Sequence, residues 1–264
     1  MNKLNIESKV KLNNGTMMPL LGFGTWQVKD GKTAYDAVIN ALNAGYRHID
    51  TAKFYGNEVS VGKAIRDSGI PREEIFVTTK LWPTDAINAE KSFKKSFENL
   101  DIGYIDLYLL HWPVPGMVKK TWVKLEKIYN DNDNLKAIGV SNHSVRQIKS
   151  ILDMATVIPV VNQIKCSPYN FNPAMYKFCN ENDIIMEAYS PLTRGAMLND
   201  AKLESIAEKY NKSTAQVLLR WCIQKGIVTI PKSLHKDRII ENTDIFDFEL
   251  SEQDIKKLDS FSKK

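Results

Sequence analysis

Residues 22–27, GFGTWQ, decide between two folds that the rest of the sequence would allow. They follow a short apolar run, where a doubly wound nucleotide-binding sheet carries its glycine-rich G-x-G-x-x-G turn. The first two glycines are present, but Gln27 stands in place of the third. The segment GNEVSVGK (56–63) also departs from the P-loop pattern, because five residues separate its glycines and Ala64 follows the lysine. The sequence therefore disfavours an open, doubly wound sheet.

Eight apolar runs of strand length occur along the chain, and helical patterns separate most of them. In VKKTWVKLEKIY (118–129) apolar residues recur at helix spacing, and STAQVLLRWCIQ (213–224) opens with a capping box. Eight strands alternating with helices in about 250 residues predict an α/β fold, a (β/α)8 TIM barrel, with residues 1–264 as a single domain. The runs are LLGFG (20–24), YRHID (46–50), IFVTTK (75–80), YIDLYLLH (104–111), LKAIGV (135–140), PVVNQ (159–163), IIMEAYS (184–190) and IVTIPK (227–232).

The N-terminal segment SKVKLNNGTMMPL (8–20) predicts a β-hairpin that turns at Asn14-Gly15, because Asn-Gly is a strong hairpin-turn signal.

Charge, hydropathy and cysteine content limit the classes of partner and the cellular compartment that we expect for this chain. The formal net charge is +5, but the lysines are scattered among acids, so we expect no nucleic-acid partner. No apolar run is long enough to span a bilayer, so we expect no membrane partner. The three cysteines form no C-x-x-C pair, and with no signal-peptide pattern this favours the cytoplasm.

Polar or aromatic residues end most of the predicted strands. In a barrel the carboxyl ends of all strands share one rim, and barrel active sites lie at that rim. Residues that are distant in sequence would therefore converge there. These strand-end residues are Asp50, Lys80, His111, Ser141, Asn142, Asn162, Gln163, Tyr189 and Lys232.

Four of the rim residues form a chemically coherent set: Asp50, Tyr55, Lys80 and His111. Each alone has an ordinary structural explanation, such as a cap acid, a loop aromatic, a surface lysine or a core histidine. Together they suit a carbonyl that becomes an alkoxide. Tyr55 would deliver the proton, with its pKa of about 10 lowered by the Lys80 ammonium. Asp50 would hold Lys80 charged, and a neutral His111 would orient the carbonyl oxygen.

The stretch GYRHIDTAKFYGNE (45–58) looks like the first signature of the aldo-keto reductases, and the chain resembles that family over essentially its whole length. The resemblance implies a (β/α)8 barrel that binds NADPH without a Rossmann motif, and a catalytic tetrad of Asp50, Tyr55, Lys80 and His111. Six further motifs match in order and spacing: TTKLWP (78–83), DLYLLHWP (106–113), IGVSN (138–142), NQIKCSPY (162–169), AYSPLTRG (188–195) and IPKSLHKDRIIEN (230–242).

The resemblance also assigns binding residues. Ser141, Asn142 and Gln163 would hold the nicotinamide carboxamide, and Tyr189 would stack on its ring. Lys232, Ser233 and Arg238 would hold the adenosine 2′-phosphate, and Glu241 and Asn242 would contact the adenine. A lysine plus an arginine suit a dianionic 2′-phosphate, which favours NADPH over NADH. The full expected cofactor set is Thr25, Trp26, Asp50, Ser141, Asn142, Gln163, Tyr189, Ser190, Leu192, Lys232, Ser233, Arg238, Glu241 and Asn242. The expected substrate-binding set is Trp26, Tyr55, Trp82, His111 and Trp112.

Two positions depart from the family pattern: Ser167 stands where many relatives have histidine, and His143 where phenylalanine is common. We expect effects on packing rather than on chemistry. Short segments after Trp112 and after Leu258 predict an open, permissive site for small aldehydes and dicarbonyls, with keto-sugars and quinones as further candidates. We expect a monomer. Two alternatives stay open: a metal-dependent barrel hydrolase that uses His48 and Asp50, although no ligand cluster completes a metal site, and a non-catalytic NADPH-binding regulatory subunit.

Overall fold

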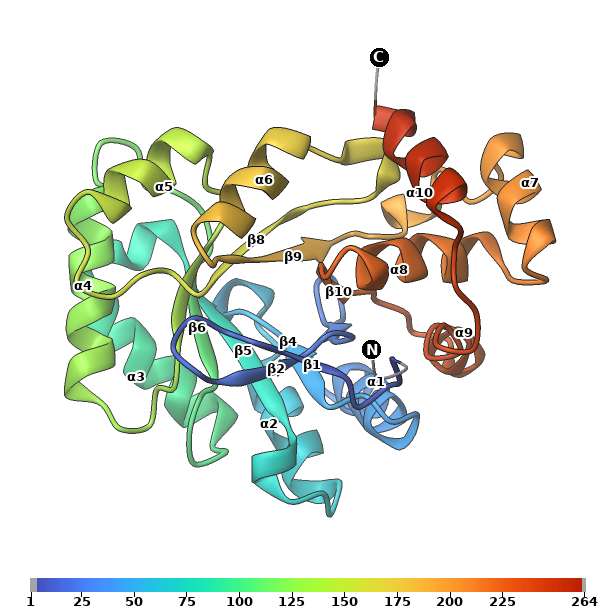
Figure 1. Cartoon of the computed structure of the whole chain (residues 1–264). Helices are drawn as coiled ribbons and strands as arrows, with labels where there is room; N and C mark the ends of the chain where they lie inside the picture. The colour runs from blue at the N-terminus through green and yellow to red at the C-terminus, as the bar shows by residue number, and fades with distance from the viewer. Residues whose placement is uncertain (1–3, 263–264) are drawn as a thin grey trace.

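The computed structural model describes residues 4–262, and within them eight parallel strands form one sheet in the order β10-β9-β8-β7-β6-β5-β4-β3 (Figure 1). The sheet curls back on itself: Thr229 N donates to Leu20 O at 2.9 Å, and Gly22 N donates to Thr229 O at 2.9 Å. The predicted TIM barrel and its eight strands are confirmed. The strands are β3 (Phe23–Gly24), β4 (His48–Asp50), β5 (Phe76–Leu81), β6 (Leu107–Leu110), β7 (Ile138–Ser141), β8 (Val161–Lys165), β9 (Ile185–Tyr189) and β10 (Val228–Ile230).

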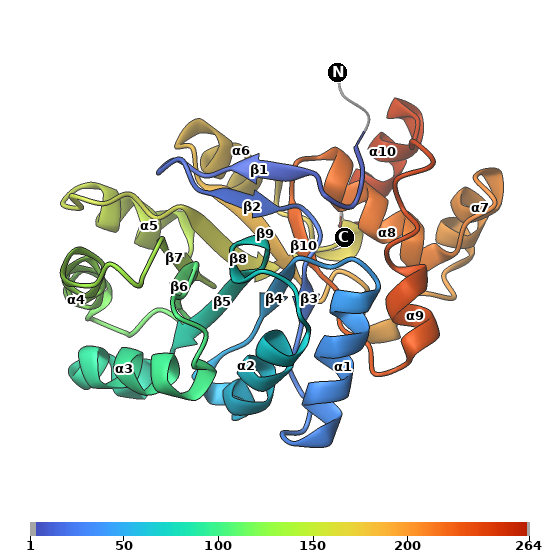
Figure 2. The same cartoon turned by 90° about the horizontal axis from the view of Figure 1, so that it is seen from below.

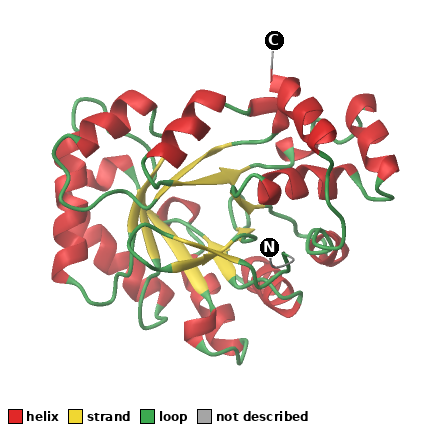
Figure 3. Cartoon of the chain, viewed as in Figure 1, coloured by secondary structure: helices red, strands yellow, loops and turns green. Residues whose placement is uncertain are grey.

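Helices surround the barrel and bury its outer face, as Figures 2 and 3 show. The capping box predicted at Ser213 and Gln216 is present at the start of α8. Gly62 lets α2 lie directly on the end of α3, because a Cβ there would sit 1.8 Å from Leu100 O. The helices are α1 (Lys32–Asn43), α2 (Glu58–Asp67), α3 (Ala89–Leu100), α4 (Val118–Asp131), α5 (Val145–Leu152), α6 (Pro173–Glu181), α7 (Ala201–Lys209), α8 (Thr214–Gln224), α9 (Lys236–Glu241) and α10 (Glu252–Asp259).

The predicted N-terminal hairpin is also confirmed, as β1 (Lys9–Lys11) and β2 (Met17–Pro19). Its turn docks on the barrel through side-chain amides. Asn13 Nδ2 donates to Pro159 O and to Asp183 O, both at 3.2 Å, and Asn14 Nδ2 donates to Lys136 O at 2.9 Å. These carbonyls precede β8, β9 and β7, so the hairpin covers the amino end of the barrel and leaves the carboxyl rim free. Among residues 4–262, no helix has the length and apolar character needed to cross a bilayer.

Candidate active site

The four residues predicted at the rim converge around the ammonium group of Lys80. Lys80 lies in β5 and its side chain is fully buried. Its Nζ donates to Asp50 Oδ1 at 2.8 Å, to Thr51 O at 2.8 Å, and to Tyr55 Oη at 3.2 Å. Asp50 ends β4, and Tyr55 ends a short 3-10 turn, Lys53–Tyr55, which begins three residues later. His111 follows β6 directly, and its ring lies edge-on to that of Tyr55 with centroids 5.6 Å apart.

Burial dominates the proton affinity of Tyr55. It raises the pKa of the phenol to about 12, and the Lys80 ammonium, which acts in the opposite direction, offsets only part of that rise. The expectation that Tyr55 would have a lowered pKa is therefore wrong in its net direction, although Lys80 does lower it. Burial also disfavours the charged form of Lys80, but Asp50 and Tyr55 outweigh it and leave the pKa of Lys80 raised. At neutral pH the site thus holds a neutral phenol beside a cation.

His111 is uncharged at neutral pH. Burial, with a smaller contribution from Lys80, lowers its pKa to about 3. Its ring packs edge-on against Trp82 as well as Tyr55, with centroids 5.1 Å apart in the Trp82 pair. Its Nδ1 is buried and has no hydrogen-bond partner within residues 4–262. The neutral ring is the form that the sequence analysis requires, and its hydrogen bond to a substrate oxygen stays a prediction.

Two further buried polar side chains, Gln163 and Glu187, extend the network around Asp50. Gln163 Nε2 donates to Asp50 Oδ2 at 2.8 Å and to Glu187 Oε2 at 3.0 Å. Burial raises the pKa of Glu187 to about 8, and the charge of Asp50 adds to that rise. Both carboxyl groups accept hydrogen bonds from the amide nitrogen of Gln163, which fixes the orientation of the amide. The carbonyl oxygen of Gln163 bonds to neither of them. Glu187 was not predicted, because it lies two residues before the polar end of its strand.

Aromatic rings line the mouth above Tyr55. Phe54 stacks on Trp82 with centroids 3.7 Å apart and planes 11° apart, and Trp26 also stacks on Phe54, at 5.7 Å. Phe54 is 47% exposed, so much of its ring is open to the mouth. Trp112 lines the same cavity. Phe54 is absent from the predicted substrate set, although its position directly before Tyr55 was a signal for it.

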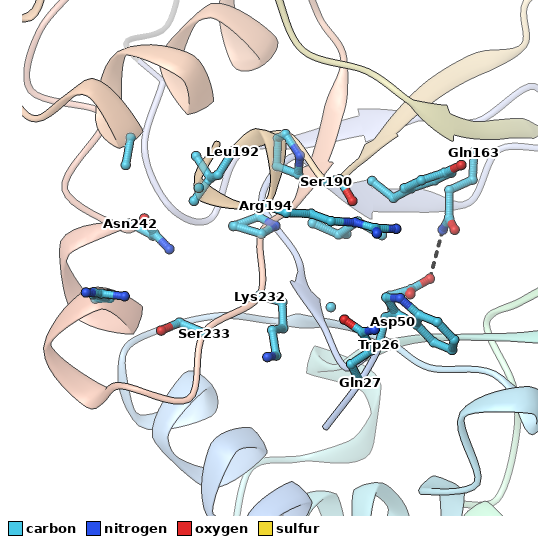
Figure 4. A pocket seen from close by; sticks show the side chains of 18 of the residues that line it. Trp26, Gln27, Asp50, Gln163, Ser190, Leu192, Arg194, Lys232, Ser233 and Asn242 are labelled. Carbon is cyan, nitrogen blue, oxygen red and sulfur yellow. Dashed lines mark hydrogen bonds between the residues drawn. The ribbon is translucent and has the colours of Figure 1, made fainter. Parts of the chain in front are cut away.

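A cavity of about 950 Å³ extends from these rings across the carboxyl rim to α9 (Figure 4). At one end, Tyr189 Oη donates to Asn142 Oδ1 at 2.8 Å, and Ser141 Oγ donates to Gln163 O at 2.9 Å. Every predicted site residue lines the cavity except Lys80, which lies beneath it, and Thr25, whose buried hydroxyl donates to Asp50 O. Lining residues that the sequence analysis did not assign to the site are Gly24, Gln27, Phe54, Pro191, Arg194, Gly195, Leu198, Asn199, Ser213, Thr214, Ala215, Ile230 and Pro231.

The two residues that depart from the family pattern are buried in the loops that follow β7 and β8. His143 is buried and its Nδ1 is 2.8 Å from Ser141 O, while burial lowers its pKa to about 4. Ser167 is buried, and its hydroxyl oxygen accepts a hydrogen bond from Asn170 Nδ2.

The part of the chain that the structure describes holds no group of three or more His, Cys, Asp or Glu side chains placed to bind a metal ion.

The sequence model of the Aldo/keto reductase family matches residues 20–263. The chain belongs to the aldo/keto reductase family. Glyoxal reductase of Bacillus subtilis (strain 168) is 46% identical to it, over 98% of this chain and 94% of that protein. The 9,11-endoperoxide prostaglandin H2 reductase of Trypanosoma cruzi (strain CL Brener) is 44% identical to it, over 96% of this chain and 91% of that protein. The crystal structure of an aldo/keto reductase from Brucella melitensis is similar in fold, with a TM-score of 0.91 and 45% sequence identity. The match covers 96% of this chain and 99% of that chain.

Membership of the aldo/keto reductase family makes the chain an oxidoreductase, and names such as glyoxal reductase and aldehyde reductase among its relatives support carbonyl reduction. The barrel of the family is the one that the eight strands form here. The motifs quoted from the sequence supply the rim residues of this barrel.

Proposed function

We propose that this protein reduces aldehydes and ketones to alcohols with NADPH, and that Tyr55 is the general acid. The observation that carries the proposal is the contact of Tyr55 Oη with the buried Lys80 ammonium, at 3.2 Å, directly beneath the aromatic mouth. A phenol is otherwise a weak acid at neutral pH. The adjacent cation stabilises the phenolate that remains once the proton has left.

Each residue of the set has a distinct task in this proposal. Bound NADPH would supply the hydride that the carbonyl carbon accepts. Tyr55 would transfer its proton to the carbonyl oxygen, and neutral His111 would hold that oxygen in place by a hydrogen bond. Asp50 keeps Lys80 charged and fixed, since Lys80 Nζ also lies 2.7 Å from Asp50 Oδ2. Buried charges are stable only when paired in this way.

The charges along the cavity support a dinucleotide with a 2′-phosphate as the cofactor. At its α9 end, Lys232 and Arg238 line the cavity with exposed side chains that make no hydrogen bond or ion pair among residues 4–262. Two free cations there match a dianionic phosphate better than a ribose hydroxyl. At the other end, the amides of Asn142 and Gln163 match the nicotinamide carboxamide. This favours NADPH as the cofactor, with Ser233, Glu241 and Asn242 around the adenosine.

We expect the Arg238→Ala variant to lose most of the preference for NADPH. Removing one of two cations should weaken NADPH about 10- to 100-fold, which corresponds to one charge-assisted hydrogen bond, and should change NADH less than about 3-fold. Dissociation constants for both cofactors, measured by quenching of tryptophan fluorescence, test this. An equal loss for both cofactors would show that Arg238 does not contact the 2′-phosphate.

Small aldehydes and dicarbonyls are the proposed substrates, with keto-sugars and quinones as further candidates. The half-exposed rings of Phe54 and Trp112 leave the mouth open, and the similarity to a glyoxal reductase supports dicarbonyls. The test is the loss of NADPH absorbance at 340 nm with a panel of these compounds. We expect several of them to be reduced at comparable kcat/KM. Tight NADPH binding without any turnover would instead favour a regulatory subunit.

A further inference from the structure

Glu187 lies in the middle of β9, is fully buried, and shares its surroundings with the Asp50–Lys80 pair. Gln163 joins the two carboxyl groups, because its Nε2 donates to Asp50 Oδ2 at 2.8 Å and to Glu187 Oε2 at 3.0 Å. Figure 4 shows the first of these bonds. Two carboxyl groups and one ammonium group therefore belong to a single buried network. Unless one carboxyl group is protonated, the network carries an unpaired negative charge, which burial makes costly.

The hydrogen bonds of Lys80 decide which carboxyl group holds the proton. An ammonium group has three hydrogens to donate. The Lys80 Nζ donates to Asp50 Oδ1 at 2.8 Å, to Thr51 O at 2.8 Å and to Tyr55 Oη at 3.2 Å. No N–H group of Lys80 is left for Glu187. The ammonium thus keeps Asp50 ionised, and the proton belongs on Glu187.

The surroundings of Glu187 Oε1 also suit a neutral carboxyl group. This oxygen has no hydrogen-bond partner among residues 4–262 and lies 3.7 Å from His48 Nε2. His48 supplies no charge there, because burial lowers its pKa to about 3, and its Nε2 is already 3.1 Å from Thr78 Oγ1. On the strands that flank β9, the residues in register with Glu187 are Gln163 and Val228, neither of which titrates. Burial, the largest cause, accordingly raises the pKa of Glu187 to about 8.

We propose that Glu187 is a positioning residue that must hold a proton for the reduction to proceed at full rate. In its neutral form it accepts the hydrogen bond from Gln163 and leaves the Lys80 charge to Asp50 and the Tyr55 phenolate. An ionised Glu187 would add a second negative charge to the network and raise the pKa of Tyr55 further. The inference rests on the proposed function, and it adds an alkaline limit that Glu187 sets rather than Tyr55.

The first test is the pH dependence of single-turnover reduction at saturating NADPH, in wild type and in Glu187→Gln. Glutamine stays neutral at every pH and keeps an oxygen that can accept the bond from Gln163. We expect the wild-type rate to fall about 10-fold from about pH 7 to about pH 10, the effect of one charge that raises the pKa of Tyr55 by about one. The Glu187→Gln rate should stay level over this range, because the pKa of Tyr55 is about 12. Glu187→Leu, a second neutral variant, should also show no alkaline fall.

The second test needs no cofactor. A carboxyl group with a raised folded-state pKa stabilises the native state below its unfolded pKa of about 4.3, and this contribution is lost as pH rises to the folded value of about 8. Glutamine undergoes no such loss. The melting temperature of Glu187→Gln, relative to that of wild type, should therefore rise between about pH 5 and about pH 8 and change little above it.

Glu126→Gln is the matched control for the kinetic test. Glu126 is also a buried glutamate, but its Oε1 accepts bonds from Thr156 N and Val157 N, and it does not line the cavity. A glutamine oxygen can accept the same bonds. This variant should therefore keep the alkaline fall in rate that wild type shows.

The outcomes separate this inference from the proposed function. Wild-type protein that reduces no carbonyl compound at any pH would end the proposed function, and the alkaline limit with it. Reduction by wild type, with the same alkaline fall in Glu187→Gln, would overturn the role of Glu187 alone. A relative melting temperature that does not change with pH would show that Glu187 holds no proton and would also overturn it. A level rate in Glu187→Gln, with the fall retained in Glu126→Gln, supports the assignment.

Discussion

The Tyr55→Phe variant should bind NADPH almost as well as wild type and reduce carbonyl compounds about 10³- to 10⁴-fold more slowly, which is near the upper range for loss of a general acid. Phenylalanine keeps the ring that packs 4.9 Å from Trp26 and 5.6 Å from His111, so the pocket retains its shape. Only the hydroxyl group is lost, together with its bond from Lys80. Single-turnover reduction with saturating NADPH measures the chemical step directly.

A matched control is Tyr35→Phe. The Tyr35 hydroxyl donates to the Asp67 carboxylate, and neither residue lines the cavity. This variant should keep the wild-type rate. A Tyr55→Phe enzyme that retained more than about a tenth of the wild-type single-turnover rate would show that another group donates the proton.

The convergence of the four rim residues could be predicted because the barrel itself brings them together. Asp50 and Lys80 are the last polar residues of two strands that pair in parallel, with Asp50 beside Thr78, and His111 follows the next strand. Alternating apolar runs predict the strands, and the strand ends predict the rim. No knowledge of the packing inside the barrel is needed for that step.

The residues that sequence reasoning missed depend on packing and on backbone conformation. The sequence shows that Glu187 is an acid in the middle of a strand, but it does not show that Glu187 contacts Gln163 inside the barrel. The net direction of the Tyr55 pKa depends on how completely the surrounding residues bury the phenol. Arg194 lines the cavity from a loop in which its φ is 55°, a conformation that L-amino acids rarely adopt, so no propensity argument predicts its place there.

The Lys80→Met variant should lose both activity and stability. Methionine has a similar length, but it leaves the buried Asp50 carboxyl without its cation. Removing one partner of a buried ion pair typically costs about 3–5 kcal/mol of the free energy of unfolding. The rate of reduction should fall at least about 10²-fold, because no charge would stabilise the Tyr55 phenolate. Urea unfolding and single-turnover kinetics measure the two effects separately.

The loss of stability in Lys80→Met should depend on pH in a defined direction. Burial already raises the pKa of Asp50, and loss of Lys80 removes the main opposing interaction, so the folded-state pKa should rise further. A carboxyl group with a raised folded-state pKa favours the native state below its unfolded pKa, and that contribution is lost as pH rises through the folded value. Relative to wild type, the variant should therefore be less destabilised at about pH 5 than at about pH 8.

The double variant Asp50→Asn with Lys80→Met separates catalysis from folding. It removes both charges, and the carbonyl oxygen of the introduced amide can still accept the hydrogen bond from Gln163. Replacing a whole buried ion pair by neutral groups is often neutral for stability. The free energy of unfolding should thus return to within about 1 kcal/mol of wild type, while reduction stays at the level of Lys80→Met. If activity returned together with stability, Lys80 would serve only to neutralise Asp50, and Tyr55 would donate its proton without help from the ammonium.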